Sequence, residues 1–348
     1  MKKFVGFPSI EQFRNVVREV KLNTDYKGAD ENGKPIYRND SVYPTITFTG
    51  TVKIHGTNAG VCSDGVETWA QSRNNIITPE NDNAGFATWA YKERAALADI
   101  LERIRGRMNV AEGDIVAVYG EWAGANIQKG VAVSGLPKFF TVFGVRVISG
   151  DKYSWVPTTL WHDLVEDASK YCEGLFSIFQ FGEYSVDIDF NSPEQVQNIL
   201  GELTIKVEEE CPVGTFFGRV KGTDVTTGEG IVWTAYRGDG HQYCFKVKGE
   251  KHSVSKVKTL AAVDVEKVNS VKECVDKVCT VNRMKQGFDY LAEQGLDRIP
   301  QNLGVYLKWL NGDIFKEELD TIVESGLTPK DMTKEISNLG RKFFLENM

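Results

Sequence analysis

The hydrophobic pattern of this 348-residue chain changes once, at about residue 258. Before that point, short runs rich in β-branched residues alternate with amphipathic helical stretches, which is typical of a mixed α+β unit. After it, three stretches place apolar residues at helical spacing and none has the alternation of a strand: 263–294, 303–325 and 328–346. We therefore predict an α+β domain over residues 1–258 and a small all-α domain over residues 259–348.

The expected elements of the first domain follow from the same patterns. Strands are predicted at 45–53, on both sides of the Asp64-Gly65 turn within 60–71, and at 114–119, 139–148, 229–236 and 242–248. Helices are predicted at 8–22, 84–108, 158–172 and 192–210. The polar stretch 23–44 contains two glycines and a proline, so it predicts a loop or a hairpin.

Composition narrows the class of protein. The chain has 41 basic and 48 acidic residues and a net charge of −7, which argues against a surface coated with basic charge but not against a local basic groove. No apolar run approaches the roughly 20 residues of a membrane span, and residues 1–19 lack the apolar block of a signal peptide. The six cysteines form no Cys-x-x-Cys pair and the four histidines do not cluster, so no zinc site is expected.

Four short stretches carry groups suited to phosphate chemistry. Lys53 ends a strand and is followed by a glycine turn, a place where burial or a nearby cation can make an amine nucleophilic. Glu121 follows another strand directly, and Glu229 enters a strand between two glycines. Lys246 and Lys248 alternate on one strand, so both ammonium groups face the same side, as a polyphosphate requires. Taken alone, Lys53, Glu121 and the lysine pair are each better explained as exposed surface residues.

Taken in order, these stretches resemble the motifs of covalent nucleotidyltransferases, which comprise ATP-dependent DNA ligases, RNA ligases and capping enzymes. Residues 53–58, Lys-Ile-His-Gly-Thr-Asn, are similar to the phage RNA ligase 2 family, because DNA ligases usually carry aspartate where His55 stands. Residues 120–129, 246–256 and 280–283 resemble further segments of that family. The resemblance covers the chain from about residue 45 to 345.

The resemblance implies a nucleotidyltransferase domain of ATP-grasp-like antiparallel sheets flanked by helices, followed by a helical domain. It implies an ATP-dependent RNA ligase that joins 3′-hydroxyl and 5′-phosphate ends through a lysyl-AMP intermediate and an adenylated 5′ end. The expected substrate is a nick in duplex RNA, and the expected cofactors are ATP and Mg²⁺ or Mn²⁺. We expect a cytoplasmic monomer without a membrane partner, in a host cytoplasm if the chain is phage-encoded.

The same resemblance implies roles for particular residues. Lys53 would attack the α-phosphorus of ATP, while Lys246 and Lys248 would contact the α-phosphate. Glu121 would bind the ribose, and Glu229 would lie near Lys53 and a divalent metal.

Five further residues complete the implied set. Ile54 and Arg73 would bind the nucleotide, with Arg73 reaching either the nucleotide or an RNA phosphate. Phe143 would stack on adenine or, equally well, be an ordinary strand residue of the core. His55 and Asn58 would support the later steps.

Three positions depart from the family pattern: Val52 stands where many members have glutamate, Thr234 where a lysine is expected, and Gly144 where an acidic residue is expected. They leave open an RNA-end-binding protein whose catalysis has decayed, and a ligase acting on DNA or mixed ends is a second alternative. The helical pattern after residue 258, in place of a β-barrel OB domain, favours RNA. Arg283 and Lys285 are the residues expected to contact a duplex.

Overall fold

The computed structural model describes residues 2–38, 40–219, 225–253 and 271–348. The chain divides into two compact units, each built from three segments. The first, here the sheet unit, comprises Met1–Ile10, Ile46–Asp187 and Glu202–Lys246, and the second, here the helical unit, comprises Glu11–Thr45, Ile188–Gly201 and Val247–Met348. The predicted domain boundary after residue 258 lies outside the described residues and stays a prediction.

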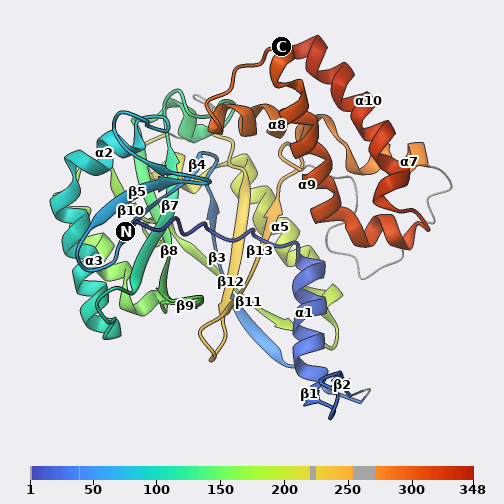
Figure 1. Ribbon diagram of the computed structural model, residues 1–348, viewed down its shortest axis with the longest axis horizontal. Coiled ribbons are helices and arrows are strands. Elements are labelled where there is room, and N and C mark those ends of the chain that lie inside the picture. Colours follow the sequence, from blue (N-terminus) through green and yellow to red (C-terminus); the bar gives the residue numbers. More distant parts are fainter. Residues whose placement is uncertain (1, 39, 220–224, 254–270) are drawn as a thin grey trace. The chain divides into compact units, whose positions relative to one another are not determined.

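A seven-stranded sheet forms the larger part of the sheet unit. Its strands run in the order β10-β8-β7-β4-β5-β6, with β9 paired to β8. Their bounds are Leu175–Ser177, Phe139–Ser149, Ile115–Ala123, Thr57–Ser63, Thr68–Ser72 and Ile76–Ile77, and Lys152–Trp155 for β9. Helices α2 (Phe86–Lys92), α3 (Arg94–Met108) and α4 (His162–Ala168) cover one face, where alternate strand residues form the main core (Figure 1).

The N-terminal segment lies across the other face of this sheet. The Gln71 side-chain amide donates to the Val5 carbonyl at 2.6 Å, and its oxygen accepts from the Val5 N–H at 3.2 Å. The Tyr119 hydroxyl donates to the same carbonyl at 2.9 Å. The Phe7 ring packs edge-on against Tyr119 and Trp155, with centroids 5.3 and 5.7 Å apart. The N-terminal segment, which is not helical here, therefore packs on this face of the sheet.

A four-stranded sheet, in the order β11-β3-β12-β13, has most of its residues in the sheet unit. The strands span Glu183–Asp189, Thr45–Lys53, Gly230–Tyr236 and Gln242–Lys248. On one face, Trp233 stacks with Phe245 and Phe245 contacts Phe48, at centroid separations of 6.4 and 5.3 Å. Gly50 pairs with Trp233, and a Cβ at Gly50 would lie 2.7 Å from the indole ring. Since strand residues alternate, Lys53 points to the opposite face.

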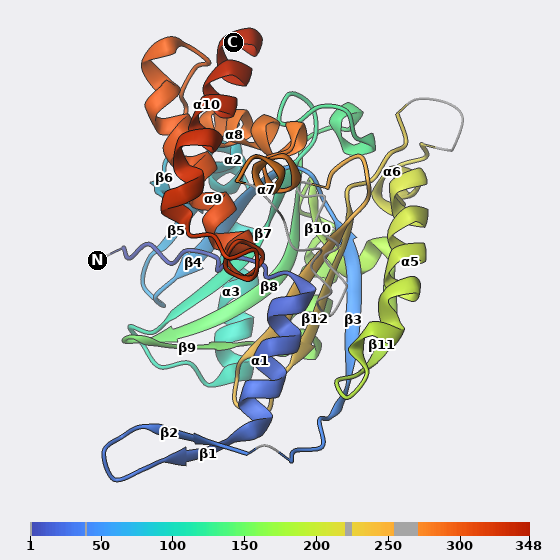
Figure 2. The same ribbon diagram turned by 90° about the vertical axis from the view of Figure 1, so that its right-hand side faces the viewer.

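The helices that join these strands include α5 (Gln197–Glu209) and α6 (Pro212–Phe216). In the helical unit, the helices are α1 (Phe13–Asp25), α7 (Val271–Val278), α8 (Val281–Glu293), α9 (Leu303–Glu324) and α10 (Pro329–Asn347). Strands β1 (Tyr26–Ala29) and β2 (Pro35–Tyr37) form an antiparallel hairpin. Helices α8, α9 and α10 pack on one apolar core (Figure 2). Within the described residues, no helix combines the length and apolar character needed to cross a membrane.

An ionic cluster lies inside the helical unit. The Arg283 side chain is fully buried, and its guanidinium lies 2.8 Å from the Glu318 carboxylate and 3.1 Å from Asp313. Arg14 of α1 contacts Glu318 at 3.0 Å and Asp320 at 2.7 Å, which ties α1 to α9. The prediction that Arg283 contacts an RNA duplex is wrong, because its side chain is fully buried and its donors face the carboxylates of Asp313, Glu317 and Glu318. Lys285 is exposed, and its predicted contact stays a prediction.

The predicted α+β class and the helical C-terminal part are confirmed. The expected helix over 84–108 is two helices that meet at Glu93, and the stretch 23–44 forms a hairpin. The short strands β9 and β10 were not predicted, because three or four residues show too little alternation. Strand β11 was also missed, although its sequence Glu-Tyr-Ser-Val-Asp-Ile-Asp alternates polar and apolar residues. Strand β10 pairs with β8 in parallel, so the larger sheet is mixed rather than wholly antiparallel.

The ionic cluster predicts a large difference between two arginine variants. Arg283→Ala removes a fully buried cation that faces three carboxylates and leaves Arg14 as a cation beside Glu318. It should lower the free energy of unfolding by about 3 kcal/mol or more, because breaking a buried ion pair leaves buried charge that is poorly compensated. Arg18→Ala is the control, since Arg18 is 55% exposed and contacts Asp320 at 3.2 Å. It should cost less than about 1 kcal/mol. Urea unfolding measures both, and equal losses would contradict the burial argument.

Candidate active site

The turn from Lys53 to Gly56 is the corner at which the chain passes from the four-stranded to the seven-stranded sheet. Strand β3 ends at Lys53 and β4 begins at Thr57. A Cβ at Gly56 would lie 2.4 Å from the Trp122 carbonyl oxygen, so only glycine fits this approach. The Gly56 N–H donates to a Glu121 carboxylate oxygen at 3.0 Å. The corner is therefore fixed by its close packing against the Trp122 carbonyl and by the hydrogen bond to Glu121.

Lys53 lies against a buried carboxylate. Strand β12 pairs antiparallel with β3 and sets Gly230 opposite Lys53, which brings the preceding Glu229 to the lysine. Lys53 Nζ lies 2.7 Å from Glu229 Oε2, and His55 Nδ1 lies 3.4 Å from the same oxygen. The Glu229 side chain is 2% exposed, whereas that of Lys53 is 20% exposed. Three predicted residues thus meet, with the amine still open to a reactant.

Glu121 and Asn58 lie together on the larger sheet. They are directly opposite each other in the β4–β7 pair, so both point to the face that the N-terminal segment crosses. The Asn58 amide is 3.5 Å from the Gly120 carbonyl, a long contact. Burial raises the pKa of Glu121 to about 7, against the opposing effect of the Lys53 ammonium. Glu121 consequently titrates near neutrality while it holds the Gly56 N–H.

The lysines of β13 occupy its less buried face. Tyr243, Phe245 and Val247 are buried and alternate with Lys246 and Lys248, which are partly exposed. Since Phe245 packs on the core face of the four-stranded sheet, Lys246 points to the same side of that sheet as Lys53. The sequence carries further lysines after this strand: Lys251 is exposed, whereas Lys256 and Lys258 lie outside the described residues.

The structure explains how the three departures from the family pattern are accommodated. Val52 is buried on the core face of β3, away from the side to which Lys53 points. Thr234 pairs with Thr49, four residues and about 13 Å along the strand from Lys53, and donates to the Thr49 carbonyl. A Cβ at Gly144 would lie 3.0 Å from the Trp155 ring, so a larger side chain there would displace the tryptophan.

The remaining predicted residues surround this region. Phe143 is the extra residue of a bulge in β8, and its ring centroid lies 5.0 Å from that of Phe7. Arg73 follows β5, is partly exposed and makes no ion pair with the described carboxylates. Ile54 is buried. Phe7 is a neighbour of the site that sequence reasoning missed, since no local pattern links residue 7 to the strand at 139–149.

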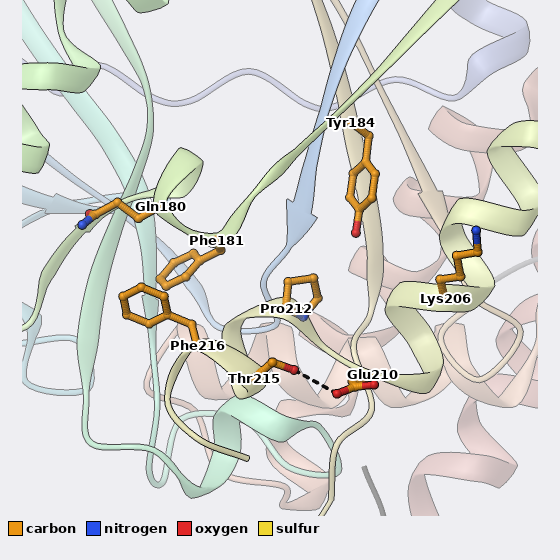
Figure 3. Close-up of a pocket in the computed structure, with 8 residues that line it drawn as sticks. All are labelled: Gln180, Phe181, Tyr184, Lys206, Glu210, Pro212, Thr215 and Phe216. Carbon is orange, nitrogen blue, oxygen red and sulfur yellow. Dashed lines mark hydrogen bonds between the residues drawn. The ribbon is translucent and has the colours of Figure 1, made fainter. Parts of the chain in front are cut away.

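A surface pocket of about 440 Å³ lies elsewhere in the sheet unit (Figure 3). It shares no residue with the predicted site, and Thr215 within it donates to Glu210 at 3.3 Å. Its lining residues come from the segments around β11, α5 and α6: Gln180, Phe181, Tyr184, Lys206, Glu210, Pro212, Thr215 and Phe216.

A metal ion would find few protein ligands at the Lys53 corner. No group of three or more His, Cys, Asp or Glu side chains suited to hold a metal occurs within the described residues. Glu229 is a single buried carboxylate. That fits Mg²⁺, which commonly takes one or two carboxylates and fills its remaining positions with substrate phosphates and water.

The sequence of this region identifies the family. The RNA ligase family model matches residues 46–248, which is more than half of the chain, and the chain belongs to that family. The match contains Lys53, Glu121, Glu229 and both lysines of β13.

Solved structures of an RNA ligase from Naegleria gruberi are more distantly similar. The form with PPi is 16% identical over 72% of this chain and 58% of that chain, with a TM-score of 0.45. A variant with ATP and Mn is 16% identical over 72% and 57%, also with a TM-score of 0.45. The chain thus spans less than two thirds of the length of that ligase. No curated protein sequence matches it.

The raised pKa of Glu121 predicts how stability changes with pH. The pKa rises from 4.5 to about 7 on folding, so the folded state binds this proton more tightly. The resulting stabilisation is complete below about pH 4.5 and is lost as pH rises to about 7. Relative to Glu121→Gln, the wild type should lose roughly 1–3 kcal/mol of unfolding free energy across this range. Urea unfolding at pH 5 and 7.5 measures the difference.

The control for this measurement is Glu67→Gln, which alters an exposed carboxylate next to β5 of the same sheet. The difference between this control and the wild type should stay constant over the two pH values. A constant difference for Glu121→Gln as well would contradict the raised pKa.

Proposed function

We propose that this protein is an ATP-dependent RNA ligase that joins 3′-hydroxyl and 5′-phosphate ends through a lysyl-AMP intermediate. The observation that carries the proposal is the Lys53–Glu229 pair. A partly exposed amine lies 2.7 Å from a buried carboxylate, within the region that matches the RNA ligase family. Such a pair holds an amine at a defined point and gives it a proton acceptor.

In the first step, Lys53 Nζ attacks the α-phosphorus of ATP. A P–N bond forms, the bond from the α-phosphorus to the bridging oxygen breaks, and pyrophosphate leaves with the electron pair. The amine must release protons in this process, and Glu229 Oε2 is the acceptor nearest to it. His55 Nδ1, at 3.4 Å from the same oxygen, can share the proton with Glu229.

Apart from the bond that Lys53 forms, phosphoryl transfer of this kind depends on positioning and on neutralising charge. Lys246 and Lys248 supply cations for the α-phosphate. Arg73 supplies a planar donor for a phosphate of the nucleotide or the RNA. Mg²⁺ or Mn²⁺ bound beside Glu229 would neutralise further phosphate charge.

The nucleoside part of ATP has candidate partners on the larger sheet. Glu121 can accept hydrogen bonds from the ribose, and it already fixes the Gly56 turn. Phe143 offers an aromatic ring beside Phe7 for the adenine. Ile54, which directly follows Lys53 in the chain, is a further candidate to contact the nucleotide.

Transfer to RNA completes the proposed reaction. The 5′-phosphate oxygen attacks the phosphorus of lysyl-AMP and releases the amine of Lys53. The RNA 3′-hydroxyl then attacks the adenylated 5′-phosphate and AMP leaves. His55 and Asn58, on either side of Gly56, are placed to support these steps. We propose a nick in duplex RNA as the substrate and a cytoplasmic monomer as the working form.

The first test is covalent labelling with α-labelled ATP and Mg²⁺. The wild type should become labelled, and Lys53→Ala should lose the label by at least about 10³-fold, because the proposed nucleophile is removed. Lys53→Arg keeps a cation beside Glu229 but is not nucleophilic, so it should also stay unlabelled. Lys34→Ala, in the exposed β1–β2 hairpin, is the control and should label normally. An unlabelled wild type would refute the proposal and favour a decayed end-binding protein.

The second test compares four substrates of one sequence: nicked duplex RNA, nicked duplex DNA, a mixed nick with RNA on the 3′-hydroxyl side, and single-stranded RNA. Nicked RNA should be sealed at least about tenfold faster than nicked DNA, since A-form shape and 2′-hydroxyls distinguish the two. Gel separation of sealed and unsealed strands measures the rates. Equal rates on RNA and DNA nicks would contradict the proposal that the substrate is RNA. Faster joining of single-stranded RNA would contradict the proposal that the substrate is a nick in a duplex.

A further inference from the structure

The segment Thr280–Arg283 carries three side chains with different tasks, and the proposed reaction uses none of them. Thr280 caps helix α8 by accepting from the Arg283 N–H at 3.3 Å. The Arg283 side chain belongs to the buried ionic cluster. Asn282 neither caps the helix nor joins the ionic cluster. Its side-chain amide points away from α8 to another part of the helical unit.

The Asn282 amide binds the chain that leaves β13. Its nitrogen Nδ2 donates to the Lys251 carbonyl at 2.9 Å and to the Ser253 carbonyl at 3.0 Å. An –NH₂ group has two hydrogens, so a single amide satisfies both carbonyls. The His252 N–H donates to the Gly249 carbonyl at 3.1 Å and closes a turn directly before this clamp.

The clamp lies close to the cations of β13. Lys248 is the last residue of that strand, and only Gly249 and Glu250 separate it from Lys251. A turn closed by one hydrogen bond and fixed by two more leaves the end of the strand little freedom. The net contribution of each hydrogen bond to stability is only about 1 kcal/mol. Its effect on geometry is larger, because a shift of about 1 Å in a catalytic group can cost 100-fold in rate.

We propose that Asn282 is a positioning residue for adenylation: by clamping the carbonyls of Lys251 and Ser253, it holds the β13 lysines where the α-phosphate is bound. This rests on the proposed function, in which Lys246 and Lys248 neutralise that phosphate. Asn282 touches neither nucleotide nor RNA in this scheme and acts only through the exit of the strand.

The test is single-turnover adenylation at saturating ATP, which yields both a rate constant and the fraction of protein labelled. Asn282→Ala removes both donors, and Asn282→Asp keeps the size but replaces the donor with an anion facing two carbonyls. Both should lower the rate constant by at least about tenfold. A variant that is merely less stable would lower the labelled fraction and keep the rate constant of the folded molecules.

Thr280→Ala is the matched control, because it removes a hydrogen bond two residues away on the same helix without touching the clamp. It should destabilise the protein by about 1 kcal/mol and keep the adenylation rate constant within about twofold of the wild type. Normal rate constants for both Asn282 variants, or an equal loss for Thr280→Ala, would overturn the positioning role. An unlabelled wild type would instead refute the proposed function, so the two failures are distinguishable.

Discussion

The close approach of Gly56 to the Trp122 carbonyl is the constraint on which the rest of the site depends. Gly56 has no side chain and can therefore pass close to this carbonyl. This close approach lets β3 and β4, which belong to two different sheets, be joined by only three residues. The tight corner places Lys53 at the end of one sheet, three residues before Gly56. The Gly56 N–H donates to Glu121 on the other sheet. A wider turn would separate the amine from the groups proposed to bind the nucleoside.

The charged groups at this corner are buried or only partly exposed to solvent. Glu229 is buried and would be costly as an isolated anion, so Lys53 and His55 stabilise it, and the lysine is in turn kept at a fixed point. At Glu121, burial outweighs the opposing effect of the Lys53 ammonium and raises the pKa. The net charge of −7 therefore says little about this site, since the relevant cations occupy one face of one small sheet.

The departures from the family pattern have local explanations that do not require a loss of function. The position before Lys53 points into the core of the four-stranded sheet, so Val52 is suited to packing. Gly144 leaves room for the Trp155 ring, and Thr234 is satisfied within the sheet. In the helical unit, the fully buried Arg283 side chain supports the fold by pairing with Asp313 and Glu318, which shows that a basic residue in a recognisable segment need not face the nucleic acid.

Sequence by itself determined the α+β class, most strands, the helical C-terminal part and the motifs that contain Lys53, Glu121, Glu229 and the β13 lysines. Local periodicity and motif order suffice for these, because each depends on residues close together in the chain. Only the tertiary structure decided which long-range partners meet: Glu229 with Lys53, Arg283 with Glu318, Asn282 with the exit of β13, and Phe7 with Phe143. Such contacts depend on strand order and helix packing across 30 to 180 residues, and no local pattern in the chain encodes them.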